Sequence, residues 1–242
     1  IWSSLVGSEM CIRDSFRRGR VNYPHYQMSI TKSYTALAIG RAIQCGYLTM
    51  DDLNRPVCEF LTELDPSRFA KGVRTITLAD VMTMRSGIRI PQNVQQQIRS
   101  DTAENHGQHQ VQKFFEHTAP ITDRPREFKY QGIDPAITMQ VLEAVVPESA
   151  GNFLKKELLK KLNISVFQWP EDIGGLPKSA AGSSMRSRDM MKWGLLVRQH
   201  GKFNGEQLIP IDYIEQATSG LCAPSATNSY GFFFWQNITE VD

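Results

Sequence analysis

The sequence has few cysteines and no long apolar run. Its four cysteines, Cys11, Cys45, Cys58 and Cys222, match no zinc-ligand spacing and no small disulfide framework. Cys45 and Cys58 stand among apolar residues at helical spacing, so we expect buried free thiols there, and the redox compartment stays open. Because no apolar stretch approaches the ~20 residues of a membrane-spanning helix, we expect no transmembrane segment.

An excess of charge of one sign is also lacking. The 27 Lys and Arg residues nearly balance the 25 Asp and Glu residues, which gives a net charge of +2. No basic stripe alternates with aromatic residues, so a nucleic-acid partner is not expected, and the short basic cluster at residues 17–20 is interpreted as solvated. With 242 residues, the chain is long enough for one sizeable core or one large two-lobed domain.

The first residues look unnatural. The chain does not begin with Met, and residues 1–15 show no clear hydrophobic period. Residues 5–15 resemble a translated sequencing-adaptor read, so residues 1–15 are interpreted as an artefact-like leader outside the fold. We expect the folded domain within residues 16–242 and expect that the natural N-terminus, with any signal peptide, has been lost.

Residues 29–32 place a serine and a lysine three positions apart at the predicted start of a helix that ends near Cys45 and Gly46. Ser29 and Lys32 then share one helix face and can touch. A serine hydroxyl becomes a good nucleophile when a base takes its proton, and a neutral lysine in a desolvated site can be that base. Ile30 and the apolar residues after it indicate a helix packed nearly all round. An ordinary capped helix with a surface lysine fits the same pattern, so other motifs must decide between a catalytic pair and an ordinary helix.

Several further helices are predicted from caps and apolar spacing. One begins at the Thr49-x-x-Asp52 cap and runs to about residue 64, and another has Thr77 as N-cap and stops at residues 86–87. Residues 91–113 are polar and are interpreted as a solvated excursion or lid. His106 and His109 could hold a metal, but no third ligand is in view, so surface histidines are the favoured interpretation.

The second half of the chain alternates helices with turns. Apolar faces predict helices at residues 137–145, 153–162 and 187–200, and Pro210 suits the first position of another. Residues 203–206 predict a tight turn, and residues 174–177 predict a further turn. The aromatic run at residues 230–235 is the only convincing strand, and it needs partners that the sequence does not reveal.

The order of these motifs resembles the serine β-lactamase and penicillin-binding-protein superfamily. The similarity is greatest to the class C-like branch, which includes family VIII esterases, D,D-peptidase-like proteins and 6-aminohexanoate-dimer hydrolases. It covers residues 25–236. The resemblance implies an α/β (α+β) protein of the beta-lactamase/transpeptidase-like fold, with an antiparallel-sheet lobe and a helical lobe and with the sheet incomplete at both chain ends. The motifs that carry it are residues 29–32, 76–87, 128–132, 181–194, 204–209 and 230–232.

The resemblance also implies roles for individual residues. Ser29 would be the nucleophile that forms an acyl-enzyme, and Lys32 would be its proton partner. Tyr130 would share the base role and protonate the leaving group, although a packing tyrosine before a helix is the alternative. Which group takes the first proton is disputed among relatives. Gln131 and Gly132 fall at substrate-binding positions. No metal or organic cofactor is implied, and the compartment implied by family habit is the periplasm or the exterior.

Two departures from the family pattern narrow the expected function. Gly132 stands where the Tyr-x-Asn motif has an asparagine that binds a substrate amide, which favours an ester or small amide substrate over a lactam. The chain also stops at Asp242, before the Lys-Thr-Gly or His-x-Gly strand that supplies one oxyanion-hole N–H. Losing one such donor costs ~10²–10³ in rate, so we expect this fragment to be poorly folded or inactive. The alternatives are a D,D-peptidase or β-lactamase, and a non-catalytic binding module.

Overall fold

The computed structural model describes residues 22–101, 104–122 and 126–237. The artefact-like leader at residues 1–15, the basic cluster at residues 17–20 and Cys11 lie outside the described residues. Cys45, Cys58 and Cys222 are free and half-buried. Within the described part of the chain, no helix has both the length and the apolar character required to cross a membrane.

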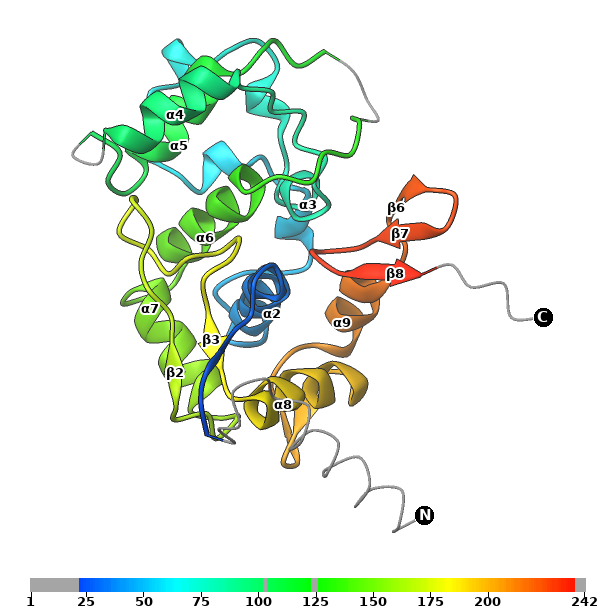
Figure 1. Cartoon of the computed structure of the whole chain (residues 1–242). Coiled ribbons are helices and arrows are strands. Elements are labelled where there is room, and N and C mark those ends of the chain that lie inside the picture. The colour runs from blue at the N-terminus through cyan, green and yellow to red at the C-terminus, as the bar shows by residue number, and fades with distance from the viewer. Residues whose placement is uncertain (1–21, 102–103, 123–125, 238–242) are drawn as a thin grey trace.

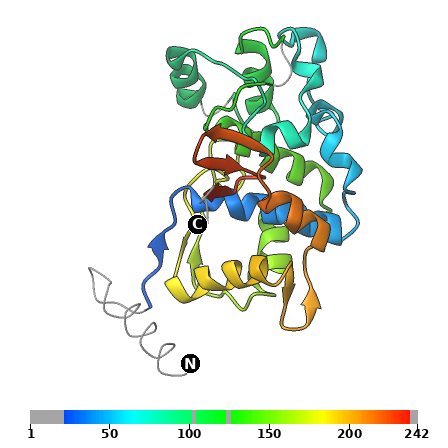
Figure 2. The same cartoon turned by 90° about the vertical axis from the view of Figure 1, so that its right-hand side faces the viewer.

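One buried helix runs through the middle of the molecule. Helix α2 (Ile30–Gln44) lies between the other helices in both views (Figures 1 and 2) and packs against α6, α9 and the segment after α7. Its residues are almost all buried from Thr31 to Ala42. The helix ends at Cys45, and Gly46 follows with a φ of 79°, a left-handed conformation that glycine adopts without strain. The predicted start and end of this helix are confirmed.

Other helices surround α2, and α4 and α5 form a pair at one end of the molecule (Figure 1). The apolar positions predicted for the second half of the chain lie on α6, on α7 with the π-helical turn after it, and on α8. Pro210 directly precedes α9. The helices are α3 (Leu78–Met82), α4 (Gln92–Ser100), α5 (His109–His117), α6 (Ile133–Val145), α7 (Ala150–Phe153), the π-helical η5 (Leu154–Leu159), α8 (Ser187–Arg198) and α9 (Ile211–Thr218).

The strands are short and antiparallel. β3 lies between β1 and β2, β4 pairs with β5, and β7 lies between β6 and β8. The predicted tight turn joins β4 to β5, where Asn204 and Gly205 both have positive φ, as a type I′ turn requires. The strands are β1 (His25–Tyr26), β2 (Phe167–Gln168), β3 (Ser184–Met185), β4 (Lys202–Phe203), β5 (Glu206–Gln207), β6 (Cys222–Ser225), β7 (Asn228–Tyr230) and β8 (Trp235–Asn237).

The helix predicted at residues 49–64 is wrong. Two 3₁₀ turns, η1 (Asp51–Asn54) and η2 (Val57–Glu59), occupy this segment, and η3 (Pro66–Arg68) and η4 (Val73–Thr75) follow. Pro56 separates the first two turns because proline cannot donate a helical hydrogen bond and forces Arg55 into an extended conformation. The Thr49–Asp52 cap forms as predicted, but no continuous helix follows it.

Residues 91–113 are only partly a solvated excursion. They contain α4, which is mostly exposed and buries only Ile98, and the start of α5, a helix that buries Val111 and Phe115 in the core. Apolar residues at three- and four-residue intervals give each helix one buried face, and the abundant glutamines concealed this period. His106 and His109 are exposed, and the described residues contain no group of three metal-ligating side chains.

The aromatic run at residues 230–235 is not one strand. β7 ends at Tyr230, and β8 begins at Trp235. Between them the chain turns into the core, where the Phe232 N–H donates to the Ala217 carbonyl at 2.9 Å and the Phe233 N–H donates to the Met82 carbonyl at 3.0 Å. The sheet partner is β6, which the sequence reading missed.

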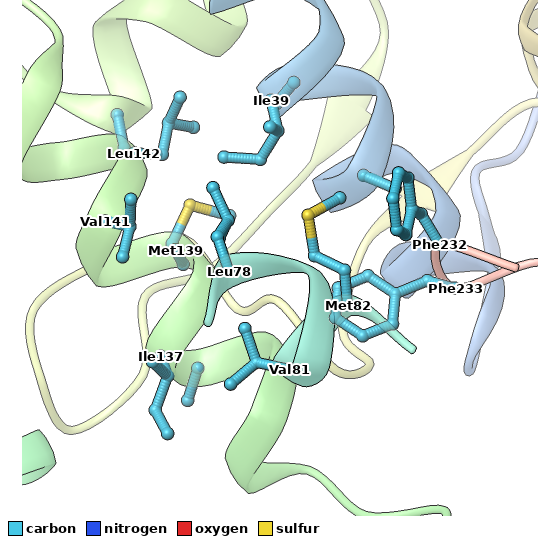
Figure 3. Close-up of a cluster of buried hydrophobic side chains, with 14 of the residues drawn as sticks. Ile39, Leu78, Val81, Met82, Ile137, Met139, Val141, Leu142, Phe232 and Phe233 are labelled. Carbon is cyan, nitrogen blue, oxygen red and sulfur yellow. The ribbon is translucent and has the colours of Figure 1, made fainter. Parts of the chain in front are cut away.

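The core joins α2 to α3 and α6 (Figure 3). The capping box predicted at Thr77 and Asp80 is present and begins α3. This helix ends at Met82, four residues before the predicted stop, because the chain turns at Met84 with a φ of 58°. The side chains drawn in Figure 3 lie together between these helices: Ile39, Leu78, Val81, Met82, Ile137, Met139, Val141, Leu142, Phe232 and Phe233.

We predict that Gly40→Ala destabilises the protein. A Cβ at Gly40 would lie 2.5 Å from the Tyr213 ring and 2.6 Å from Ile209 Cγ2, so α9 would have to move away from α2. Overpacking of this kind lowers the free energy of unfolding by ~1–3 kcal/mol. The matched control is Gly194→Ala in α8, where a Cβ meets nothing within 4 Å. Urea denaturation that gave both variants the same midpoint would contradict this packing.

Candidate active site

Ser29 lies at the N-terminal end of α2, where it is half-buried. It is the N-cap residue, but its side chain makes no capping hydrogen bond, so the hydroxyl is available for other contacts. The preceding residue, Met28, has a φ of 49°, a strained conformation for a residue with a side chain. The turn is held by Gln27, whose N–H donates to the Ser183 carbonyl at 2.8 Å, and by Thr31, whose hydroxyl donates to the Met28 carbonyl at 2.8 Å.

Lys32 is in contact with Ser29, as the sequence predicts. Its Nζ donates to Ser29 Oγ at 3.1 Å and to the Ala180 carbonyl oxygen at 2.6 Å. Lys32 is only 5% exposed and is therefore largely shielded from water, whereas Ser29 is half-buried. Ile30 differs from expectation because it is 45% exposed: α2 reaches the surface at this end, and its all-round burial begins one residue later.

Tyr130 lies beside Lys32, with the face of its ring toward the lysine. Lys32 Nζ is 4.7 Å from the ring centroid, within cation–π distance. The Tyr130 side chain is 42% exposed and contacts the rings of Tyr230 and Trp235 at centroid distances of 6.3 and 5.8 Å. Among the described residues, no hydrogen bond joins the Tyr130 hydroxyl to Ser29 or Lys32. Ser29, Lys32 and Tyr130 therefore lie close together, but Tyr130 contacts Lys32 through its ring and not through its hydroxyl.

Gln131 and Gly132 have different surroundings. The Gln131 side chain turns inward, and its Nε2 donates to Asp134 Oδ1 at 3.0 Å. Gly132 is the N-cap residue of α6, with a φ of −90° that any residue can adopt. A Cβ at Gly132 would lie 3.5 Å from the Cβ of Ala180, an ordinary contact. The structure thus places Gly132 where a side chain would reach open space, and it places Gln131 in a buried network.

A cleft reaches Ala180, the residue that accepts a hydrogen bond from Lys32, although Ser29, Lys32 and Tyr130 do not line it. Its volume is about 480 Å³, and α4, α5, the start of α6 and the loop before β3 line it. Ala180 connects the cleft to Lys32, because its carbonyl oxygen accepts from Lys32 and the residue also lines the cleft. The lining residues are Gln95, Ile98, Arg99, Gln110, Phe114, Gly132, Ile133, Ala136, Asp172, Ile173, Lys178, Ser179, Ala180 and Ala181.

Asp134 is a buried carboxyl that the sequence reading missed. It is 0% exposed and accepts hydrogen bonds at Oδ1 from the Ser86 hydroxyl at 2.7 Å and from Gln131. Its Oδ2 has no partner in the described structure. Burial raises the pKa of Asp134 from 3.8 to about 7, although the hydrogen bonds from Ser86 and Gln131 act in the opposite direction. The sequence contains one indication of this residue: Asp134 stands four positions after Tyr130, in the first turn of a helix, where a carboxylate is favoured.

Comparison with known proteins gives one family and many structures of the same fold. Residues 20–237 match the family described as Beta-lactamase. A search of curated protein sequences finds no match. One solved structure, assigned as a 6-aminohexanoate-dimer hydrolase from Bacillus anthracis, gives a TM-score of 0.73 at 17% identity and covers 93% of this chain and 62% of that chain. This chain therefore spans less than two thirds of the length of that structure.

Two further structures agree with this comparison. A D-stereospecific amidohydrolase from Streptomyces sp. gives a TM-score of 0.67 at 16% identity, with 90% of this chain and 72% of that chain covered. A penicillin-binding protein from Bacillus halodurans gives 0.70 at 14% identity, with 91% and 72% covered. Identities this low show a shared fold. The predicted beta-lactamase/transpeptidase-like fold is confirmed.

We predict that Asp134→Asn changes the dependence of stability on pH. Because the folded-state pKa is raised, the unfolded chain releases this proton at a lower pH than the folded protein does. Asp134 therefore lowers the free energy of unfolding as pH rises from 3.8 to about 7, and its contribution is constant above that range. Asparagine does not titrate, so the variant should gain in melting temperature relative to the wild type across this window. Parallel melting-temperature curves for the two proteins would contradict the prediction.

Proposed function

The chain belongs to the Beta-lactamase family, and we propose that it is a serine hydrolase of the class C-like group in which Ser29 attacks an ester or small amide to form an acyl-enzyme. The observation that carries this proposal is the contact of 3.1 Å between Lys32 Nζ and Ser29 Oγ at the end of a buried helix. We further propose that residues 16–242 belong to one hydrolase domain.

The reaction proceeds in two steps. Ser29 Oγ bonds to the carbonyl carbon while its proton passes to the basic group formed by Lys32 and Tyr130. The leaving group then departs with a proton supplied by Tyr130, and water releases the acyl group from Ser29 by the reverse route. Lys32 contacts Ser29 directly, which supports its role as the proton partner, and the Tyr130 ring lies over Lys32, which supports a place for Tyr130 in the same site.

The backbone at Ser29 supports the same chemistry. Its N–H lies at the N-terminal end of α2, and in the described part of the chain it has no hydrogen-bond partner. An unpaired N–H at a helix N-terminus favours negative charge. This group would donate to the oxyanion that develops when Ser29 attacks the carbonyl carbon.

Gly132 favours an ester or a small amide over a lactam. The family's asparagine, which binds a substrate amide, is replaced by a residue without a side chain, so no polar group projects from this position. The fold is shared with structures assigned as a 6-aminohexanoate-dimer hydrolase and an amidohydrolase, which supports an amide among the substrates. Hydrolysis of cell-wall peptides or β-lactams is the second candidate, because a penicillin-binding protein also shares the fold.

We predict that a fluorophosphonate probe adds one covalent group to the protein at Ser29. Mass spectrometry of the full-length protein should show the added mass in the wild type and no added mass in Ser29→Ala. Ser33→Ala is the matched control, because Ser33 lies one turn along α2 and donates to the Phe233 carbonyl at 2.8 Å. Labelling that persists in Ser29→Ala would rule out Ser29 as the labelled nucleophile, and the absence of labelling from the wild type would favour a non-catalytic binding module.

We also predict that Gly132→Asn shifts activity from esters toward lactams. The backbone at Gly132 accepts a side chain without strain, so asparagine can supply the missing amide. A hydrogen bond of this kind contributes ~1 kcal/mol, so the rate with a chromogenic cephalosporin relative to a p-nitrophenyl ester should rise about fivefold to tenfold. Gly132→Ala fills the same space without the amide and should leave the ratio unchanged. An equal ratio in both variants would show that Gly132 does not determine this preference.

A further inference from the structure

The cleft that reaches Ala180 has an apolar floor and a cationic rim. The floor is formed by buried side chains of α4, α5 and α6, among them Ile98, Phe114 and Ile133. The rim carries Arg99 from α4 and Lys178 from the loop before β3, and both are exposed. A surface of this composition can hold an aliphatic segment along its floor and an anionic group at its edge.

The cationic character extends into an adjoining hollow. This hollow, of about 470 Å³, shares Gln95 and Arg99 with the cleft and adds Lys129 on its opposite side. Arg99 therefore stands between the two spaces. The residues that α4 contributes here, Gln92, Gln95, Gln96 and Arg99, recur at three- and four-residue intervals, so one face of α4 faces both spaces.

Arg99, Lys129 and Lys178 form no ion pair in the described part of the chain, although Lys178 interacts electrostatically with the Asp172 carboxylate. Arg126, by contrast, pairs with Asp80 at 2.5 Å. Asp172 is the one acidic side chain among the described residues that line the cleft. Its Oδ1 accepts from the N–H groups of Gly174 and Leu176 at 2.8 and 3.3 Å, which holds the loop, and its charge also offsets part of the charge of Lys178.

We propose that the acyl part of the substrate lies in this cleft and ends in a carboxylate that binds Arg99 and Lys178. The proposal rests on the proposed function, which gives Tyr130 the protonation of the leaving group. Tyr130 faces Trp235 and Tyr230 of β8 and β7, whereas the cleft opens on the Gly132 and Ala180 side. The leaving group therefore occupies the aromatic side, and the acyl group extends along the apolar floor toward the cations.

The test compares two esters of equal acyl length. p-Nitrophenyl hydrogen glutarate ends in a carboxylate, and p-nitrophenyl valerate ends in a methyl group. The wild type should have the higher kcat/KM with the glutarate ester, and added salt should reduce this preference because it screens exposed charges. Each cation is expected to donate one charge-assisted hydrogen bond to the carboxylate. Loss of that bond in Arg99→Gln or in Lys178→Gln should lower the ratio of kcat/KM for the glutarate ester to kcat/KM for the valerate ester about tenfold, with kcat/KM for the valerate ester unchanged.

The matched control is Lys202→Gln, which removes an exposed cation on β4 that lines neither space. It should leave the preference unchanged. A wild type that prefers the valerate ester, or a preference that survives both cleft substitutions, would overturn the proposed acyl site. Loss of activity toward both esters in Arg99→Gln and Lys178→Gln would also overturn it, because the expected effect is confined to the anion.

Failure of the proposed function has a different signature. If the full-length wild type hydrolyses neither ester and takes up no fluorophosphonate, the proposed role of Ser29 as nucleophile is overturned, and the anion site is then tested by measuring ligand binding. Calorimetry with Ser29→Ala should show monomethyl glutarate binding more tightly than methyl valerate, with the difference lost when Arg99→Gln is added. Equal binding of the two ligands to Ser29→Ala would overturn the anion site independently of catalysis.

Discussion

The burial of helix α2 is the constraint on which the rest of the structure depends. A helix buried on all sides must satisfy every polar side chain that it carries into the interior, because an unpaired buried group costs ~1–3 kcal/mol or more. Three such residues, Thr31, Lys32 and Thr35, follow directly after Ser29. All three bond to the segment at residues 179–183: Thr31 to the Ser183 hydroxyl, Lys32 to the Ala180 carbonyl, and Thr35 to the Ser179 carbonyl.

These contacts connect the stability of the fold to the geometry of the site. The segment that satisfies the buried half of α2 also forms one wall of the cleft, and its Ala180 carbonyl holds Lys32 against Ser29. Gly132 also lines the cleft, and its neighbour Gln131 is bonded to the buried Asp134. Both parts of the cleft therefore depend on hydrogen bonds beneath the surface, and these buried contacts also position the proposed reacting groups.

Much of the site was predictable from local sequence, and its surroundings were not. Ser29 and Lys32 lie three residues apart on one helix, so their contact follows from helix geometry alone. Tyr130 was placed by its order among motifs, but its approach through the ring face depends on Trp235 and Tyr230, which are distant in sequence. The burial of Asp134 and the cleft between α4 and the loop before β3 depend on packing between segments, which no local pattern encodes.

The sequence alone determined the start and end of α2, the Thr77–Asp80 capping box, the Asn204–Gly205 turn and the Ser29–Lys32 contact, because each depends on residues within a few positions of one another. Tertiary structure decided the 3₁₀ turns around Pro56, the helices hidden among the glutamines of residues 91–113, and the division of the aromatic run after Tyr230. In these three segments, the secondary structure depended on which side chains pack against other segments in the core. Whether a polar helix is buried, and where a strand ends, is set by the segment packed against it.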